Sequence, residues 1–155
     1  MNKLGLNQEK VNDLITDLNS LLANYQLLYS NVRGFHWNIK GNNFFELHLK
    51  FEEIYNDLQV KIDEVAERIL TLGGAPENTF TMYLKSASIK EISKETNGAK
   101  GLENIIEGIS IIIKLERSLL EKSAEINDEG TNSLVSGYIT EHEKSLWMFN
   151  AYLSN

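Results

Sequence analysis

Four polar residues between positions 44 and 72 have the chemistry and the spacing of metal ligands. His48 and Glu52 are four residues apart, and so are Asp63 and Glu67. Side chains four residues apart lie on the same face of an α-helix, so each pair can converge on one ion. Imidazole and carboxylate groups without thiolates favour Fe(II), Mn(II) or Zn(II) over soft ions. These residues therefore predict a metal site.

The two pairs cannot hold one ion from a single helix. They are separated by eleven residues, or about 16 Å along a helix, whereas metal–ligand bonds are about 2 Å long. A second copy of the helix, antiparallel across a two-fold axis, would place His48 and Glu52 of one chain against Asp63 and Glu67 of the other. A two-fold interface repeats each contact, so this arrangement predicts two sites per dimer, both between subunits. The alternative is that the four residues are charges on a solvated face.

The stretch that carries these residues is predicted to be one long helix, because residues 44–72 contain neither Gly nor Pro. Three- and four-residue steps define a stripe expected to face the core: Leu47, Phe51, Ile54, Leu58, Ile62, Val65 and Ile69. A second apolar stripe surrounds the four polar residues and favours an interface over a solvated face: Phe45, Leu49, Val60, Ala66 and Leu70. The charged residues of the remaining face are expected to contact solvent: Glu46, Lys50, Glu53, Asp57, Lys61, Glu64 and Arg68.

Helical periodicity elsewhere predicts an all-α fold, a ferritin-like four-helix bundle. A first helix is expected from the Asn7 cap to His36, a third over residues 102–126, and a fourth after a Thr131 cap. The long connection between residues 73 and 101 is predicted to contain one or two short helical turns, within the segments 79–85 and 88–95. A connection of this length is typical of a crossover between two parallel helices, which predicts up-down-down-up topology.

His36 continues the apolar face of the first helix. A short turn would fold it toward His48, which makes it a candidate third nitrogen ligand or a base that contacts a ligand. The alternative is a core histidine whose hydrogen bonds are satisfied.

Composition limits the possible functions. The 155 residues predict a single domain spanning 1–155. The net charge of −7 disfavours nucleic-acid binding, and the absence of Cys excludes thiolate metal sites and disulfides. No apolar run approaches the ~20 residues of a membrane span, and the N-terminus has no signal-like apolar core. A cytoplasmic location is the simplest expectation.

Several spaced motifs resemble one known family, the Dps proteins or miniferritins, which are named as DNA-binding proteins from starved cells. They are NVRGFHWNIKG at 31–41, FFELH at 44–48, FEEIY at 51–55, DEVAER at 63–68 and LGGAP at 72–76, with the ending EKSLWMF at 143–149. The resemblance covers nearly the whole chain. It implies a hollow homo-oligomeric shell of twelve subunits that oxidises iron at two-fold interfaces and stores it as ferric oxide.

The resemblance assigns the ferroxidase ligands to His36, His48 and Glu52 of one subunit and to Asp63 and Glu67 of its partner. It implies two iron ions per site, hydrogen peroxide as oxidant, protection from oxidative stress, and Zn(II) as a possible substitute metal. Some family members have Asp where this chain has Glu52, which keeps the charge but lengthens the arm. No His follows a Glu by three residues, which argues against the di-iron proteins that place their metals inside the bundle.

The resemblance also assigns roles to three residues that are not iron ligands. Trp37 matches an aromatic residue at the family's site, where it would quench radicals; the alternative is a packed anchor at the helix end. Asp128 and Glu129 match the region that lines iron-entry pores at three-fold axes; the alternative is an ordinary polar turn.

Direct DNA binding is not expected despite the family name. Only Lys3 precedes the first helix, so the chain lacks the Lys/Arg-rich tail through which phosphate contacts would add affinity. A second class of function remains open at this point, in which the shell binds metal without catalysis or is recognised by host cells.

Overall fold

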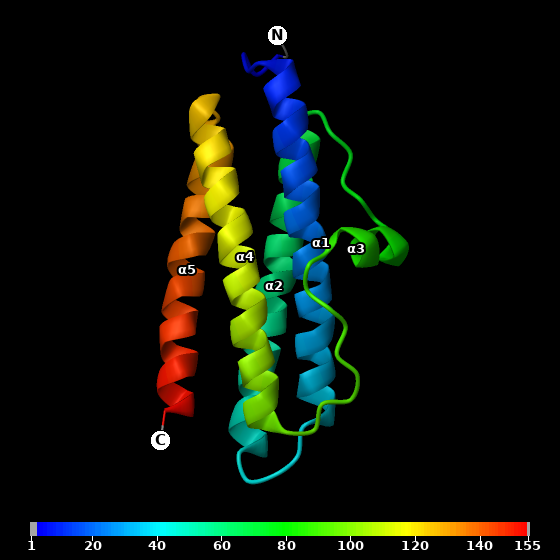
Figure 1. Ribbon diagram of the computed structural model, residues 1–155, viewed down its shortest axis with the longest axis vertical. Coiled ribbons are helices and arrows are strands. Elements are labelled where there is room, and N and C mark those ends of the chain that lie inside the picture. Colours follow the sequence, from blue (N-terminus) through cyan, green and yellow to red (C-terminus); the bar gives the residue numbers. More distant parts are fainter. Residues whose placement is uncertain (1–2, 155) are drawn as a thin grey trace.

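The computed structural model describes residues 3–154 and consists of four long helices and one short one. The helices are α1 (Gln8–Asn38), α2 (Phe44–Thr71), α3 (Phe80–Ser86), α4 (Gly98–Glu125) and α5 (Glu129–Leu153). Figure 1 shows α1 and α5 running down and α2 and α4 running up, with the crossover that contains α3 passing over the outside of α1. The predicted all-α, up-down-down-up bundle with a long middle crossover is therefore confirmed.

Side-chain caps define where the helices begin. The Asn7 side chain accepts a hydrogen bond from the backbone nitrogen of Lys10, as expected. The fourth long helix begins earlier than predicted, because Asp128 rather than Thr131 is its cap. The Asp128 carboxylate accepts from the backbone nitrogen of Thr131, and this residue already lies inside the helix.

The predicted helical turn at residues 88–95 is wrong, because two asparagines of α1 hold this segment in a non-helical conformation. Asn24 Oδ1 accepts from the backbone nitrogens of Ser88 and Ile89, both at 3.0 Å. Asn31 accepts from the nitrogen of Ile92 and donates to a carbonyl oxygen of the same segment. Backbone groups that would bond to one another in a helix are thus satisfied by side chains.

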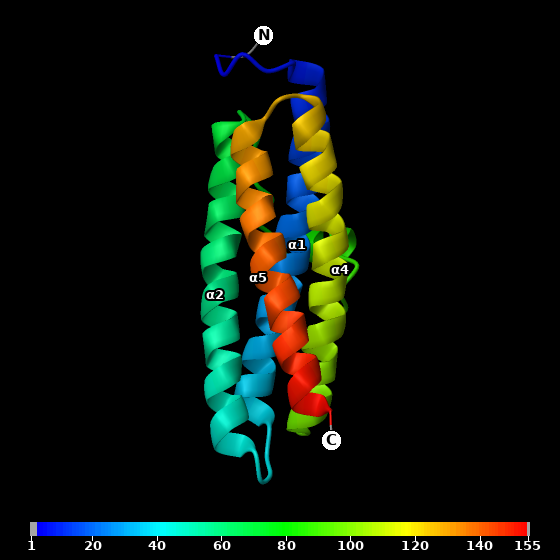
Figure 2. The ribbon, with the colours of Figure 1, turned by 90° about the vertical axis from the view of Figure 1, so that its left-hand side faces the viewer.

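The core-facing stripe of α2 is confirmed. Most of the charged face expected to contact solvent is exposed or half-buried, but one of its residues, Lys61, is buried toward α5. Lys61 is only 3% exposed, and its Nζ lies 2.8 Å from Asp57 and 2.6 Å from Glu141 of α5. Glu64 accepts from the hydroxyl of Tyr138 at 2.5 Å. Figure 2 shows the α2 and α5 ribbons side by side, and these side-chain contacts join the two helices. Long charged side chains cover apolar surface with their stems, so periodicity alone does not distinguish such a face from a solvated one.

None of the helices within residues 3–154 is long and apolar enough to cross a bilayer.

Candidate functional site

Two histidines meet where α1 ends and α2 begins. The rings of His36 and His48 stack with centroids 3.7 Å apart. His36 Nδ1 lies 2.7 Å from the carbonyl oxygen of His48, and His48 Nδ1 lies 2.8 Å from the carbonyl oxygen of His36. A carbonyl only accepts hydrogen bonds, so each Nδ1 carries the proton and donates it. In the neutral form each ring then has its lone pair on Nε2, the tautomer that can bind a metal through that atom.

The connection between α1 and α2 brings the two rings together. Gly41 adopts a left-handed conformation with φ of 111°, which a residue without Cβ adopts at little cost, and its carbonyl oxygen accepts from Phe44 N at 3.1 Å. The Phe44 ring stacks on His48 at 4.9 Å, and the Tyr55 ring lies edge-on to His36 at 5.3 Å. These aromatic neighbours fix the plane of each imidazole.

The carboxylates divide into one near the histidines and two at a distance. Glu52 follows His48 by one helical turn and is half-buried, whereas Asp63 and Glu67 are exposed on the second half of α2. Within residues 3–154 of one chain, no three His, Asp or Glu side chains come close enough together to hold a metal ion. One subunit thus presents a partial set of ligands at each of two places on α2.

An exposed apolar stripe borders all four residues of α2. Phe45 is 81% exposed, Leu49 60%, Val60 56% and Leu70 58%. Large apolar side chains that line one face of a helix in this way mark a surface that another molecule covers. The stripe predicted from the sequence is therefore present, and it is exposed in the described chain except at Ala66, which is half-buried.

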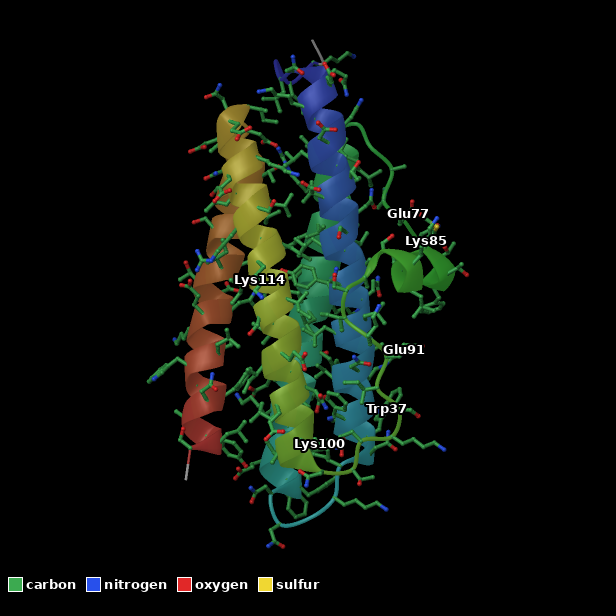
Figure 3. All side chains as sticks on the ribbon, in the orientation of Figure 1. Trp37, Glu77, Lys85, Glu91, Lys100 and Lys114 are labelled. Atoms are coloured by element: carbon green, nitrogen blue, oxygen red, sulfur yellow. The ribbon has the colours of Figure 1, made fainter. Side chains whose placement is uncertain are left out.

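Trp37, near the end of α1, is not a buried anchor. It is 64% exposed, and Figure 3 labels it near the lower end of α1. The guanidinium of Arg33 lies between two rings, 4.9 Å from the centroid of Trp37 and 5.0 Å from that of Tyr29. Trp37 therefore reaches its chain neighbours through a cation–π contact.

Asp128 and Glu129 have different surroundings. Asp128 is 2% exposed and lies 2.6 Å from Arg68, and it also accepts from the Thr131 hydroxyl at 2.6 Å. Its carboxylate thus serves as a helix cap and as one half of a buried ion pair. Glu129 is exposed, so of the two only Glu129 presents its carboxylate to solvent.

A second polar cluster lies in the centre of the bundle and was not assigned from the sequence. Glu116 is fully buried; it accepts from the Tyr25 hydroxyl at 2.6 Å and lies 3.0 Å from His142 Nδ1. Burial, together with the Glu116 carboxylate, raises the pKa of Tyr25 well above its usual 10.0. Burial also raises the pKa of Tyr138, whose hydroxyl donates to Glu64. The available sequence signal was a titratable residue within each apolar stripe, Glu116 on α4 and His142 on α5.

Two further residues were also missed: Tyr55, which contacts His36, and Arg33, which contacts Tyr29 and Trp37. Both lie within motifs of the resemblance, but their contacts depend on how the helices pack.

Comparison with known proteins agrees with this architecture. The family model described as ferritin-like domain matches residues 15–155. The chain is 47% identical over 148 residues to the DNA protection during starvation protein of Porphyromonas gingivalis, covering 96% of this chain and 93% of that protein. It is 37% identical over 141 residues to DNA protection during starvation protein 2 of Bacillus anthracis, covering 91% and 97%.

Solved structures show the same fold. The DPS protein of Vibrio cholerae O1 is described as a member of a broad superfamily of ferritin-like diiron-carboxylate proteins. It superposes with a TM-score of 0.98 at 51% identity, covering 99% of this chain and 97% of that one. Dps from Staphylococcus aureus gives a TM-score of 0.89 at 36% identity, covering 93% and 97%. With this identity over nearly its full length, the chain belongs to the Dps family of ferritin-like proteins.

Proposed function

We propose that this protein stores and detoxifies iron by oxidising Fe(II) at sites between subunits of a hollow homo-oligomeric shell. Family membership supports iron storage and stress protection in general. One observation carries the specific proposal. The Nε2 atoms of His36 and His48 are left free by two reciprocal hydrogen bonds, in a chain that offers too few ligands nearby to complete a site.

A second copy of the chain completes the ligand set. When α2 pairs antiparallel with α2 of the partner, His48 lies opposite the partner's Glu67, and Glu52 lies opposite the partner's Asp63. The exposed apolar stripe then becomes buried around the ligands, which excludes water and favours association. Two-fold symmetry forms this site twice in each dimer, and twelve subunits would close the shell.

The donors suit iron as a substrate. Three carboxylates and two imidazoles accommodate two Fe(II) ions and leave coordination positions open for an oxidant. Hydrogen peroxide takes one electron from each Fe(II); its O–O bond breaks, two protons are taken up and two waters form. Because both electrons leave together, no hydroxyl radical is released. Zn(II), which accepts the same donors but has no redox chemistry, is expected to bind and to block the reaction.

The oxidised iron would then collect inside the shell. The side chain of Glu52 is one methylene longer than that of Asp, so its carboxylate would reach further toward the ions. Glu129 is the better candidate of the two acidic residues for an iron-entry pore, because Asp128 is already paired with Arg68.

The test measures how many Fe(II) ions the purified assembly oxidises per molecule of hydrogen peroxide. Fe(II) is added anaerobically, then hydrogen peroxide or, separately, oxygen, while ferric absorbance and the solubility of the iron are recorded. We expect rapid oxidation of two irons per peroxide, with the iron retained in a large particle. Asp63→Asn is expected to abolish the rapid phase, whereas Glu53→Gln, an exposed carboxylate elsewhere on α2, serves as the control.

A rate equal to that of protein-free buffer would refute ferroxidase activity. If Zn(II) still bound in that case with one chain's carboxylates and its partner's imidazoles, the protein would be a metal-binding shell without catalysis.

A further inference from the structure

Arg33 carries a positive charge that no described residue of its own chain neutralises. Among residues 3–154, no carboxylate oxygen lies within 4.0 Å of its guanidinium. The guanidinium contacts the rings of Tyr29 and Trp37, and its Nη1 lies 3.3 Å from the Tyr29 hydroxyl. Its Nε atom is buried and has no hydrogen-bond partner. A buried donor without an acceptor is costly, so a polar group missing from the single chain is expected here.

The contacts between α1 and α2 define the level at which Arg33 lies. His36 stacks on His48, and Tyr29 lies against Tyr55 with ring centroids 6.0 Å apart. The two contacts are seven residues apart on each helix, so a step toward the start of α1 matches an equal step toward the end of α2. Arg33 precedes His36 by three residues and therefore lies beside the turn that contains Phe51 and Glu52.

The same turn of α2 faces an acidic residue in the proposed dimer. Antiparallel pairing places the partner's Asp63 opposite Glu52, at the level of Arg33. Asp63 is exposed in the single chain and forms no ion pair among its described residues. An unpaired cation and an unpaired carboxylate thus meet at one level of the interface.

We propose that Arg33 of each subunit forms an ion pair with Asp63 of the partner subunit. This inference rests on the proposed function, because it uses the same two-fold pairing. A guanidinium presents several N–H donors to one carboxylate, so Arg33 can bind one oxygen of the partner's Asp63 while the other faces the iron site. The ion pair would both stabilise the dimer and hold the Asp63 carboxylate in position to bind iron.

The test is a double-mutant cycle on metal-free protein, with Arg33→Gln, Asp63→Asn and the double variant. Subunit association is measured by sedimentation over a dilution series, and helix content by circular dichroism shows that each chain is folded. Each single change is expected to weaken association about tenfold per ion pair. The double variant is expected to be no weaker than either single one, because the second change removes a charge that is already unpaired. Arg33→Lys is expected to restore part of the loss, and Arg117→Gln, in an exposed intrachain pair on α4, is the control.

Mixing the two single variants gives an independent readout. A mixed dimer of Arg33→Gln and Asp63→Asn chains retains one intact pair and loses the other completely. Like dimers instead retain two unpaired charges. Native mass spectrometry is therefore expected to show mixed dimers above the random proportion. Two results would refute the ion pair. One is a random proportion of mixed dimers, and the other is that Arg33→Gln weakens association as much in the Asp63→Asn background as in the wild type. Either would show that Arg33 contacts only Tyr29 and Trp37 of its own chain.

Metal binding separates this inference from the proposed function. If Asp63→Asn abolishes Zn(II) binding but shows no coupling to Arg33, only the ion pair is wrong. If Zn(II) binds to Asp63→Asn with unchanged stoichiometry and affinity, the proposed iron site itself is wrong.

Discussion

Replacing Tyr25 with phenylalanine removes one hydroxyl from the centre of the bundle and is expected to destabilise the protein measurably. This hydroxyl donates to Glu116 at 2.6 Å, and both side chains are fully buried. A hydrogen bond to a charged group contributes about 1.5–3 kcal/mol, and water cannot replace the lost donor at a closed site. For a chain of this length each kcal/mol corresponds to about 2–4 °C in Tm, so a decrease of about 3–12 °C is expected.

The same substitution is expected to change stability at high pH. The pKa of Tyr25 is raised in the folded protein, mainly by burial, whereas in the unfolded chain it is near 10. The folded state therefore holds this proton more tightly than the unfolded state does. The corresponding stability is fully present below about pH 10 and is lost as pH rises above that value. Tyr25→Phe removes this contribution, so the variant is expected to lose less stability than the wild type between neutral pH and the alkaline range.

Thermal melting by circular dichroism, at one protein concentration and across a pH series, measures both effects. Tyr152→Phe is the matched control, because its hydroxyl lies 2.8 Å from Asn43 Nδ2 at an exposed position. Its free energy of unfolding is expected to change by no more than about 0.5 kcal/mol, as is typical of surface substitutions. Equal melting temperatures and equal alkaline slopes for Tyr25→Phe and the wild type would refute the stabilising role of this hydrogen bond.

Three further predictions concern assembly, the α4–α5 corner and nucleic acid. Leu49→Asp places a charge in the exposed apolar stripe and is expected to yield folded, dissociated subunits on size exclusion; an intact shell would contradict the two-fold pairing. Asp128→Ala leaves Arg68 without its partner in a largely buried pair and is expected to cost about 3–5 kcal/mol in urea unfolding. Glu143→Ala, which breaks the exposed pair with Arg117, is expected to cost no more than about 1 kcal/mol. Plasmid DNA is expected to migrate unchanged in a low-salt gel shift near neutral pH, since the net charge is −7; retardation would overturn this expectation.

The order and type of the helices could be predicted because local signals agree with the fold. Apolar residues at helical spacing, the cap at Asn7 and the glycines after α2 all indicate the same element boundaries. The proximity of His36 to His48 was also predictable, because a short turn between antiparallel helices leaves few alternatives. The non-helical course of residues 88–95 was not, because it depends on two asparagines that lie about sixty residues away in sequence.

The face of α2 toward α5 shows a second limit of prediction from the sequence. The spacing of Lys61, Glu64 and Arg68 is that of a solvated helix face, and each side chain also has a polar partner on α5 or just before it. The expectation of solvent contact failed for Lys61, which is buried, whereas Glu64 stays exposed. Sequence periodicity reports which residues share a face. It does not report whether that face meets water or complementary charges.

The sequence by itself determined the four-helix architecture and which residues share each face of α2, and from that spacing it predicted a metal site that needs a second chain. Each of these follows from local spacing, since helix geometry fixes which side chains lie together and how far apart they are. Only the tertiary structure decided the tautomers of His36 and His48, the use of Asp128 as a cap, and the isolation of the Arg33 charge. These features depend on hydrogen bonds between atoms of different elements, and such bonds form over distances that are set by packing and not by position in the chain.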